Sequence, residues 1–307
     1  MSEVRYSEYR SPRQMLAHQE YDGHLSIHDD AMAENLGFAG APIEGPTHFS
    51  QYVHLATDYF GDAWFERGCI SAHYQNMVVE GEEVRAFIEI PEPGATTIRI
   101  GAEKRDGTPV LTGTASVGPD YGETELDMRM AKLKPSDQLV ILSDLTVGQK
   151  GAGNPESVIM GLDDHMGDLY PFSLAQKLGV ITESHDYYTD SPFGGAVVPM
   201  EMISVLVQYT SHRSGFKTRG PAIGLFAAQQ IKLVNGPILV GVPYLVEREI
   251  IALSESRRTE SNWIKMSVYS EDHATLVAEV ILNSATMKES YADYAKDAQA
   301  LGKDLSA

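Results

Sequence analysis

Cysteine is nearly absent from the sequence: Cys69 is the one thiol in 307 residues. A lone cysteine cannot form an internal disulfide, and no Cys/His spacing typical of a structural zinc site is present. An internal disulfide framework is thereby excluded. Because Cys69 begins a strand-like stretch, we expect an inert thiol in the core.

The chain also lacks long apolar runs and an excess of basic residues. No run approaches the roughly 20 apolar residues of a membrane helix, and the opening MSEVRYSEYRSPRQM has no apolar signal core. Lys and Arg number 24 against 43 Asp and Glu, and the formal net charge of −19 repels nucleic-acid backbones. We expect a cytoplasmic protein that binds neither membranes nor nucleic acids, although a local basic patch could still hold an anionic cofactor.

The composition is otherwise that of a folded globular protein. Hydrophobic residues make up 43% of the chain and charged residues 22%, which is enough apolar material for a sizeable core. A length of 307 residues suits two units of roughly 150 residues each.

An internal repeat supports two units. The loop GFAGAPI is matched by PFGGAVV, and the segment QNMVVEG by QIKLVNG. Phe38 and Phe193 are 155 positions apart, and Gly81 and Gly236 are separated by the same 155 positions. A third pair, VLTGTASV and LVAEVILN, follows at an offset of 166. A shared offset at two motifs indicates tandem duplication.

Both repeats show the same order of local signals. A Gly/Pro loop precedes an apolar stretch suited to a central helix, at 48–60 and again at 200–212. Strand-like runs follow, with Asp106-Gly107 as a hairpin turn. These runs are 69–79, 83–90, 96–104 and 110–117, then 222–234, 242–253, 262–269 and 275–285. One helix followed by antiparallel strands predicts an α+β fold with the helix packed on a curved sheet.

The repeat also sets the expected domain organisation. We expect an N-terminal half in residues 1–125, a connector in 126–168, a C-terminal half in 169–290 and a tail in 291–307. For the tail we favour a solvated segment over a surface helix. For the charged segment 247–260 we favour a salt-bridged strand or hairpin surface over a phosphate site.

Two motifs resemble those of the MaoC-like enoyl-CoA hydratase/dehydratase superfamily. His28-Asp29-Asp30-Ala31 followed by GFAGAPIEG is similar to the family pattern H-x-D and G-F-x-G-x-I-x-H-G, and YQNMVVEGE is similar to a strand that ends in P-V-x-x-G-[DE]. The resemblance implies a tandem (double) hot-dog fold, with two curved antiparallel sheets each wrapped around a central helix. It implies a hydratase or dehydratase of an acyl thioester such as enoyl-CoA or 3-hydroxyacyl-CoA, with no metal or redox cofactor.

The same resemblance suggests a catalytic group in the first half. In the family a loop Asp and His act on the thioester, and backbone N–H groups at the helix start hold its oxygen. Here this implies His28 as general acid/base, Asp22 as its carboxylate partner, and N–H groups near Gly40 and Gly45 as the oxyanion site. The match is incomplete, because the family's Asp position is Gly23, so that Asp22 is offset by one residue.

Other positions have two interpretations each. Glu44 replaces the family's loop His and could stabilise the helix dipole, or, if buried, act as an acid with a raised pKa. His48 could face the acyl pocket or pack on the sheet. In the second half His185 and Asp190 could exchange protons, and Gly195 corresponds to Gly40. If the first-half site is correct, His28 and a carboxyl should share a pocket; otherwise polar groups around His185 should line it.

Three functions stay open at this point. The first is the thioester hydratase or dehydratase; the second is a hot-dog enzyme with a changed reaction, such as dehydration, isomerisation or cyclisation of a non-CoA substrate. The third is a non-catalytic binding subunit. Because a hot-dog edge strand usually pairs with another, we expect one continuous sheet across the two halves and association as a homodimer.

Overall fold

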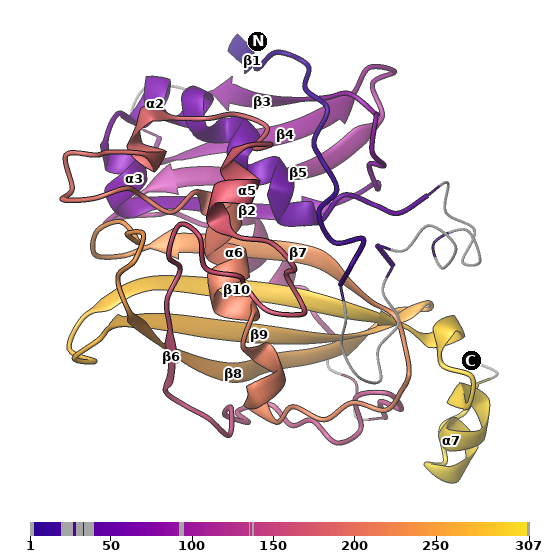
Figure 1. Cartoon of the computed structure of the whole chain (residues 1–307). Helices are drawn as coiled ribbons and strands as arrows, with labels where there is room; N and C mark the ends of the chain where they lie inside the picture. The colour runs from indigo at the N-terminus through magenta and orange to yellow at the C-terminus, as the bar shows by residue number, and fades with distance from the viewer. Residues whose placement is uncertain are drawn as a thin grey trace.

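The computed structural model describes residues 3–19, 27–28, 33, 40–91, 95–134, 136 and 138–305. The strands in this part of the chain form one ten-stranded antiparallel sheet, in the order β1-β3-β4-β5-β2-β7-β10-β9-β8-β6. The first half of the sequence builds the upper part of the sheet in Figure 1 and the second half builds the lower part.

The first half contributes five strands, and three of them lie where the sequence predicts. They are β1 (Glu3–Tyr6), β2 (Gly68–Tyr74), β3 (Val84–Ile90), β4 (Thr97–Lys104) and β5 (Pro109–Val117). The prediction of one strand over 69–79 is too long, because β2 ends at Tyr74 and the N–H groups of Gln75 and Asn76 both donate to the Val110 carbonyl.

The second half repeats this arrangement with longer strands. Its strands are β6 (Glu156–Val158), β7 (Gly224–Leu233), β8 (Tyr244–Glu255), β9 (Thr259–Ser270) and β10 (Leu276–Met287). Residues of β2 and β7 pair from Cys69 opposite Lys232 to His73 opposite Ala228. The expected continuous sheet is therefore confirmed, and β2 and β7 join the two halves at its centre.

The duplication is visible in the backbone. Gly81 and Gly236 both have positive φ, at 93° and 89°, a conformation that glycine adopts without steric cost. Pro42 and Val197, also 155 positions apart, each form an isolated antiparallel bridge, with Val79 and with Leu239. Equivalent turns and bridges at one offset are what a tandem repeat predicts.

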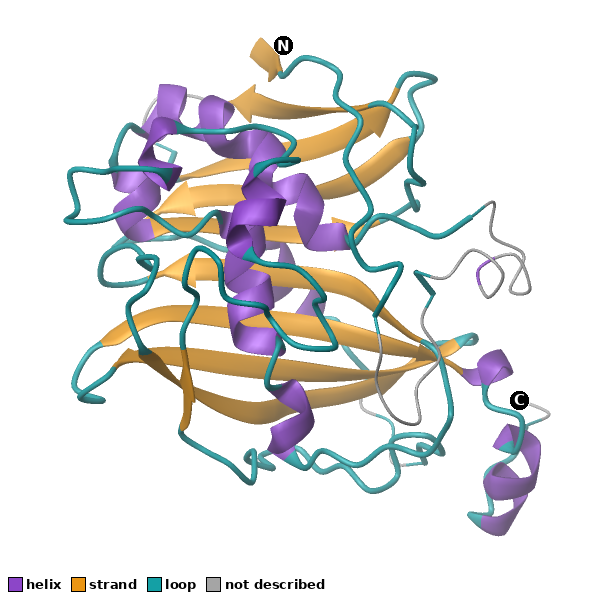
Figure 2. Ribbon diagram, in the orientation of Figure 1, coloured by secondary structure: helices purple, strands orange, loops and turns teal. Residues whose placement is uncertain are grey.

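The central helices lie on one face of the sheet, as Figure 2 shows. The single helix expected over 48–60 is instead a 3-10 helix, η1 (Gly45–Tyr52), followed by α2 (Val53–Phe60) and α3 (Ala63–Arg67). In the second half, α5 (Leu174–Leu178) and η2 (Asp186–Tyr188) precede α6 (Met200–Gln208) and η3 (Ser211–Ser214). The helix predicted over 200–212 therefore ends earlier, at Gln208, before the turn of η3.

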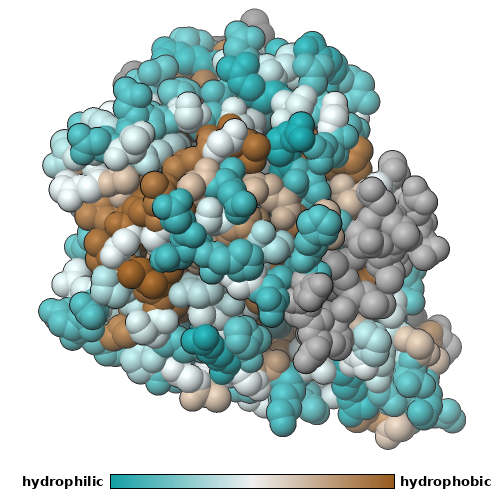
Figure 3. Space-filling view, viewed as in Figure 1, coloured by the Kyte–Doolittle hydropathy of each residue, from teal (hydrophilic) through white to brown (hydrophobic). Residues whose placement is uncertain are grey.

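The main core lies between these helices and the sheet. Every residue of α6 is buried, as its mostly apolar sequence predicts. Phe49 of η1, Ile70 of β2, Leu206 of α6 and Ile231 of β7 belong to one hydrophobic cluster that spans both halves. The helix-side surface in Figure 3 is mostly hydrophilic, with hydrophobic side chains gathered toward the left of that view, between the two halves. Cys69 is 1% exposed, and burial raises the pKa of its thiol to about 12, which confirms the inert core thiol.

The opposite face carries α4 (Glu125–Met130). The Leu126 N–H donates to Ser71 Oγ at 3.0 Å, and successive β2 side chains point to opposite faces, so α4 lies across the sheet from η1. Leu126 packs there with Ala228 and Trp263 in a separate cluster.

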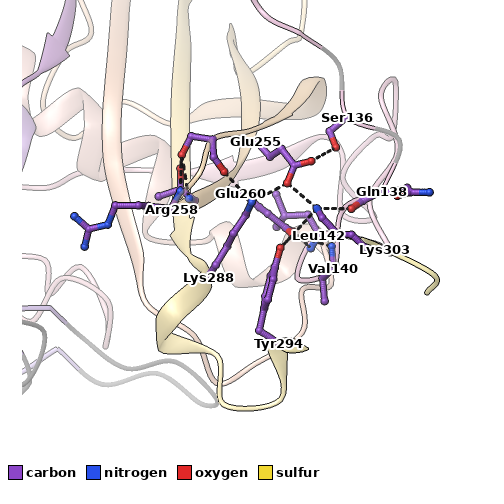
Figure 4. Close-up of polar contacts among 12 residues, drawn as sticks. Ser136, Gln138, Val140, Leu142, Glu255, Arg258, Glu260, Lys288, Tyr294 and Lys303 are labelled. Atoms are coloured by element: carbon purple, nitrogen blue, oxygen red, sulfur yellow. Dashed lines mark hydrogen bonds and ion pairs between the residues drawn. The ribbon is translucent and has the colours of Figure 1, made fainter. Parts of the chain in front are cut away.

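The C-terminal segment forms a surface helix that contacts the second half, so the expectation of a solvated tail is wrong. It forms η4 (Lys288–Ser290) and α7 (Tyr294–Ala300), and Figure 4 shows the contacts that hold it. The fully buried Glu260 accepts hydrogen bonds from the Val140 and Leu142 N–H groups and from Tyr294 Oη. Lys303 Nζ reaches Glu255 at 2.6 Å. These carboxylates bind the connector and the tail to the second half.

Arg248 corrects the expectation of a charged surface over 247–260. Its side chain is 1% exposed and pairs with Glu156 Oε2 at 2.9 Å, while Nη2 donates to the Val207 carbonyl and to Thr210 Oγ1. The expectation holds for Arg258, which forms an exposed pair with Glu289. Sequence alternation alone does not say which face of β8 is covered, because helices and loops lie over both faces of this sheet.

None of the described helices is both long and apolar enough to cross a membrane. Among the residues that the structure describes, no cluster of His, Cys, Asp and Glu has the geometry of a metal site.

Candidate active site

A cavity of about 290 Å³ opens where the first half meets the second. Its walls come from the loop before η1, the start of η1, the end of β2, the start of β7 and the segment around Tyr170. Most lining side chains are apolar; the polar ones are Gln19, His28, Glu44, His48, Tyr74, Gln75, Asn76 and Tyr170. An apolar cavity with a few polar groups is the usual form of a small-molecule site.

His28 is anchored at the cavity wall through one ring nitrogen. Its Nδ1 lies 2.8 Å from the Pro42 carbonyl oxygen and 3.2 Å from Gln14 Nε2. Gln14 Nε2 donates to the same carbonyl, and its amide is fixed because Gln14 Oε1 accepts from the Leu16 N–H. A carbonyl oxygen accepts but cannot donate, so we assign the proton of neutral His28 to Nδ1. The basic lone pair then belongs to Nε2.

His28 is held as a neutral base. Burial lowers the pKa of its imidazole below the usual 6.5, and the hydrogen bond to the Pro42 carbonyl opposes this only in part. At neutral pH the ring therefore holds one proton, which suits a group that must accept another during a reaction.

Glu44 lies in the same cavity, immediately before η1. Although it occupies the N-cap position, its side chain makes no capping hydrogen bond. Its carboxyl Oε1 instead accepts from Tyr170 Oη at 3.2 Å. Burial raises its pKa from 4.5 to about 7; Lys177 and Tyr170 oppose the rise and Glu201 adds to it. Of the two interpretations of Glu44, its burial favours the acid.

His48 and Tyr74 complete the inner wall. His48 is 3% exposed, burial lowers its pKa to about 4, and its Nδ1 has no hydrogen-bond partner. The Tyr74 ring stacks on Phe49 with centroids 6.2 Å apart and lies directly against Gly45. A Cβ at Gly45 would approach Tyr74 Cζ to 2.5 Å, so this close packing requires glycine.

Gly45 also provides the first N–H of η1, which has no acceptor within the helix because it precedes the first turn. Such an N–H at a helix start is suited to bind a negatively charged oxygen. Gly40 is described but does not line the cavity. Asp22 lies outside the described residues.

The second-half candidates are not brought to this cavity. His185 is the N-cap of η2, where its Nδ1 accepts from the Tyr187 N–H, and its ring contacts that of Phe65 at 4.8 Å. His185, Asp190 and Gly195 are absent from the lining of the 290 Å³ cavity. The structure therefore brings together His28, Glu44, Gly45 and His48 from the candidates and leaves these three elsewhere.

Sequence reasoning missed three residues near Glu44. Tyr170 and Lys177 come from a segment that matches no motif, and nothing local in the sequence indicates that they approach Glu44. Glu201 could have been found, because it is the one charged residue in the mostly apolar sequence of α6. A charge in an all-buried helix is rare unless it is paired.

Comparison with known proteins identifies the fold. No family model matches the sequence, and no curated protein matches it. A protein described as a MaoC domain dehydratase from Chloroflexus aurantiacus superposes with a TM-score of 0.60 and 12% identity, over 94% of this chain and 95% of that one. A Mycobacterium tuberculosis protein with a double hotdog fold gives 0.53 and 12%, over 93% and 96%. A MaoC-like dehydratase gives 0.50 and 13%, over 89% and 98%. The expected tandem (double) hot-dog fold is therefore confirmed.

Proposed function

We propose that the protein is a hydro-lyase that dehydrates 3-hydroxyacyl thioesters, or hydrates the corresponding enoyl thioesters, with His28 and Glu44 as its acid–base pair. The observation that carries this proposal is the joint placement of a neutral imidazole and a proton-holding carboxyl in one cavity at the start of η1. The fold supports it, because solved structures of the same fold are described as dehydratases.

The chemistry assigns one role to each group. His28 Nε2 takes the proton from Cα of the substrate, and the electron pair moves onto the thioester oxygen. The Gly45 N–H donates to this oxygen and stabilises the enolate. The enolate then collapses, the Cβ–O bond breaks, and the hydroxyl leaves as water with the proton of Glu44. A proton transfer from His28 to Glu44 restores the starting state.

The ionisation of the pair suits this direction. At neutral pH the lowered pKa of His28 keeps its base form, and a pKa of about 7 leaves about half of Glu44 protonated. Hydration starts from the opposite arrangement, with His28 protonated and Glu44 ionised, so both directions require that the pair share one exchangeable proton. General acid and base groups in such positions contribute about 10²–10⁴-fold each.

The carboxyl partner proposed from the motif alone was Asp22. It remains a second candidate for the acid, and Asp22→Asn belongs in the same set of variants as Glu44→Gln. His185 and Asp190 remain the candidates for a site in the second half.

A non-CoA substrate is favoured by the charge around the cavity. None of the described lining residues is Lys or Arg, and the sequence has neither between Arg13 and Arg67. Phosphate groups of CoA usually require such cations. A thioester on an uncharged carrier therefore belongs beside the CoA thioester in every assay.

The experiment follows loss of the conjugated enoyl absorbance with crotonyl-CoA and with crotonyl N-acetylcysteamine. We expect wild type to hydrate at least one thioester, and His28→Asn and Glu44→Gln to lower kcat/KM by at least 100-fold. His185→Asn is the matched control and should keep full activity. Activity lost in His185→Asn and kept in His28→Asn would move the site to the second half. Inactivity of wild type on both thioesters would contradict the proposal.

Two further sequence-based expectations belong to this proposal. We infer a cytoplasmic enzyme that acts as a homodimer; β1 and β6, at the two ends of the sheet order, are the edges through which copies could pair. Sedimentation equilibrium measures the oligomeric state directly, and a monomer at assay concentrations would contradict the proposed homodimer.

A further inference from the structure

A second buried charged group lies beside the candidate acid. Lys177 of α5 and Glu201 of α6 form an ion pair, with Nζ 3.1 Å from Oε1 and side chains that are 6% and 2% exposed. Removing two charges from water costs several kcal/mol per ion, and an apolar pair of similar size often stabilises a core at least as well. A buried pair in this position therefore needs an explanation other than stability.

The pair is in contact with the turn that carries Glu44. Lys177 Nζ lies 3.5 Å from Thr47 Oγ1, and the Thr47 N–H in turn donates to the Glu44 carbonyl at 3.0 Å. Tyr170, seven residues before Lys177, donates to the Glu44 carboxyl. One segment of the second half thus supplies a hydroxyl to the Glu44 carboxyl and an ammonium to the turn that carries it.

The charges in this group do not balance if all groups ionise. Lys177 offers one positive charge to two carboxyls, the buried Glu201 and the partly buried Glu44. Glu201 is the closer partner, with its direct 3.1 Å contact, and therefore takes the ion pair. Glu44 is then the carboxyl left without full compensation, and an uncompensated carboxyl in a buried site binds a proton.

We propose that Glu201 is a positioning residue of the second half that keeps a proton on Glu44 by holding Lys177 in an ion pair, so that the second half prepares the acid of the first. Its consequence for catalysis rests on the proposed function, whereas its effect on the proton of Glu44 does not. Glu201 acts through its ion pair with Lys177, because an ammonium without that partner would stabilise the ionised form of Glu44.

Several other titratable groups face Glu44. Tyr170 donates to it, Tyr74 and His48 line the same inner wall, and His28 lies in the loop wall. Burial raises the pKa of Tyr74 and lowers those of His48 and His28, so these three are uncharged at neutral pH. Lys177 and Glu201 are therefore the charged groups that act on Glu44 from within the described part of the protein.

Two substitutions should act in opposite directions. Glu201→Gln removes the competing carboxylate, so Lys177 compensates Glu44 and the pKa of Glu44 falls. Lys177→Met removes the compensation, so the pKa of Glu44 rises. Each shift should be about one unit, the lower end of what a nearby charge produces. If the Lys177–Glu201 pair had a structural role only, the two substitutions would not shift the pKa of Glu44 in opposite directions.

The test is a titration of the Glu44 carboxyl by ¹³C NMR in protein labelled at glutamate, with the resonance assigned by its loss in Glu44→Gln. Matched controls remove an exposed ion pair of α7: Lys296→Met and Asp293→Asn, whose side chains are 78% and 58% exposed. Both controls should leave the Glu44 titration unchanged. Shifts of opposite sign in Glu201→Gln and Lys177→Met support the proposal; no shift in Glu201→Gln, or shifts of the same sign, overturn it.

Folding and function are separated by design. Should Lys177→Met fail to fold because it leaves Glu201 buried and unpaired, the near-isosteric Glu201→Gln decides alone: a downward shift supports the proposal and an unchanged or upward one overturns it. The titration needs no substrate, so an inactive wild type would refute the proposed function and leave this result standing. Where wild type is active, the alkaline limb of its pH–rate profile should move with the titration.

Discussion

Glu44 should reduce the stability of the fold at neutral and alkaline pH. Burial raises its pKa from 4.5 to about 7, so between these values the folded protein holds a proton that the unfolded chain has released. The stability associated with the protonated form is complete below pH 4.5 and is lost as pH rises through 7. About 2.5 units at about 1.4 kcal/mol each gives a loss of roughly 3 kcal/mol.

Glu44→Gln removes this titration while keeping the shape of the side chain. We therefore expect the variant to gain stability relative to wild type as pH rises from about 4.5 to 7, by roughly 3 kcal/mol, with no further gain above. Urea denaturation of both proteins at intervals from pH 4.5 to 9 measures the difference in their free energies of unfolding. The other titratable groups are the same in both proteins, so their contributions to this difference largely cancel.

The control has the opposite sign. The pKa of Glu83 is lowered from 4.5 by its hydrogen bond with Arg105, so Glu83→Gln should lose stability relative to wild type as pH rises toward about 4.5, with no further loss above; the urea series for this control therefore starts near pH 3. A stability difference between wild type and Glu44→Gln that does not change with pH would refute the reasoning, because Glu44 would then titrate alike in the folded and unfolded states.

Three further predictions concern packing and buried charge. Arg248→Met leaves Glu156 buried without its 2.9 Å partner and should cost about 3–5 kcal/mol in urea denaturation; a loss below about 1 kcal/mol would contradict the buried-pair description. Glu260→Gln replaces one acceptor oxygen by a donor, so it should lower the free energy of unfolding by about 1–3 kcal/mol. It should also speed amide hydrogen exchange in residues 138–142 and in α7. Unchanged exchange in these segments would argue against the docked tail. Gly45→Ala places a Cβ against the Tyr74 ring and should cost about 1–3 kcal/mol. In the double variant, Tyr74→Ala should recover part of that loss. Strict additivity of the two free-energy changes would mean that the Tyr74 ring does not pack against the Gly45 backbone.

The strands and their pairing were largely predictable because their signals are local. Alternating apolar residues and the Asp106-Gly107 turn predict β4 and β5 to within a residue or two. The repeat extended this to the second half, and the edge-strand argument predicted that the halves share one sheet. The helix after Glu44 was less predictable, because its division into η1 and α2 depends on how this segment packs against Tyr74 and α6.

The candidate site could be predicted only where a motif marks it. His28, Glu44 and Gly45 belong to one loop motif, so a resemblance identifies them together. Tyr170 reaches Glu44, and Lys177 of α5 reaches Thr47 of η1, each across more than 120 positions of sequence, and one sequence contains no record of these contacts. The same limit explains why His185 stayed an alternative to His28 in the sequence analysis: both are loop histidines, and the structure shows that His28 lines the 290 Å³ cavity and His185 does not.

The most direct test of the acid–base pair is the pH dependence of kcat/KM for 3-hydroxyacyl thioester dehydration between pH 5 and 9. We predict a bell-shaped profile with an alkaline limb near pH 7, where Glu44 loses its proton, and with that limb absent from the residual activity of Glu44→Gln. A rate that stays constant from pH 6 to 8 in wild type, or an alkaline limb that persists unchanged in Glu44→Gln, would contradict the account.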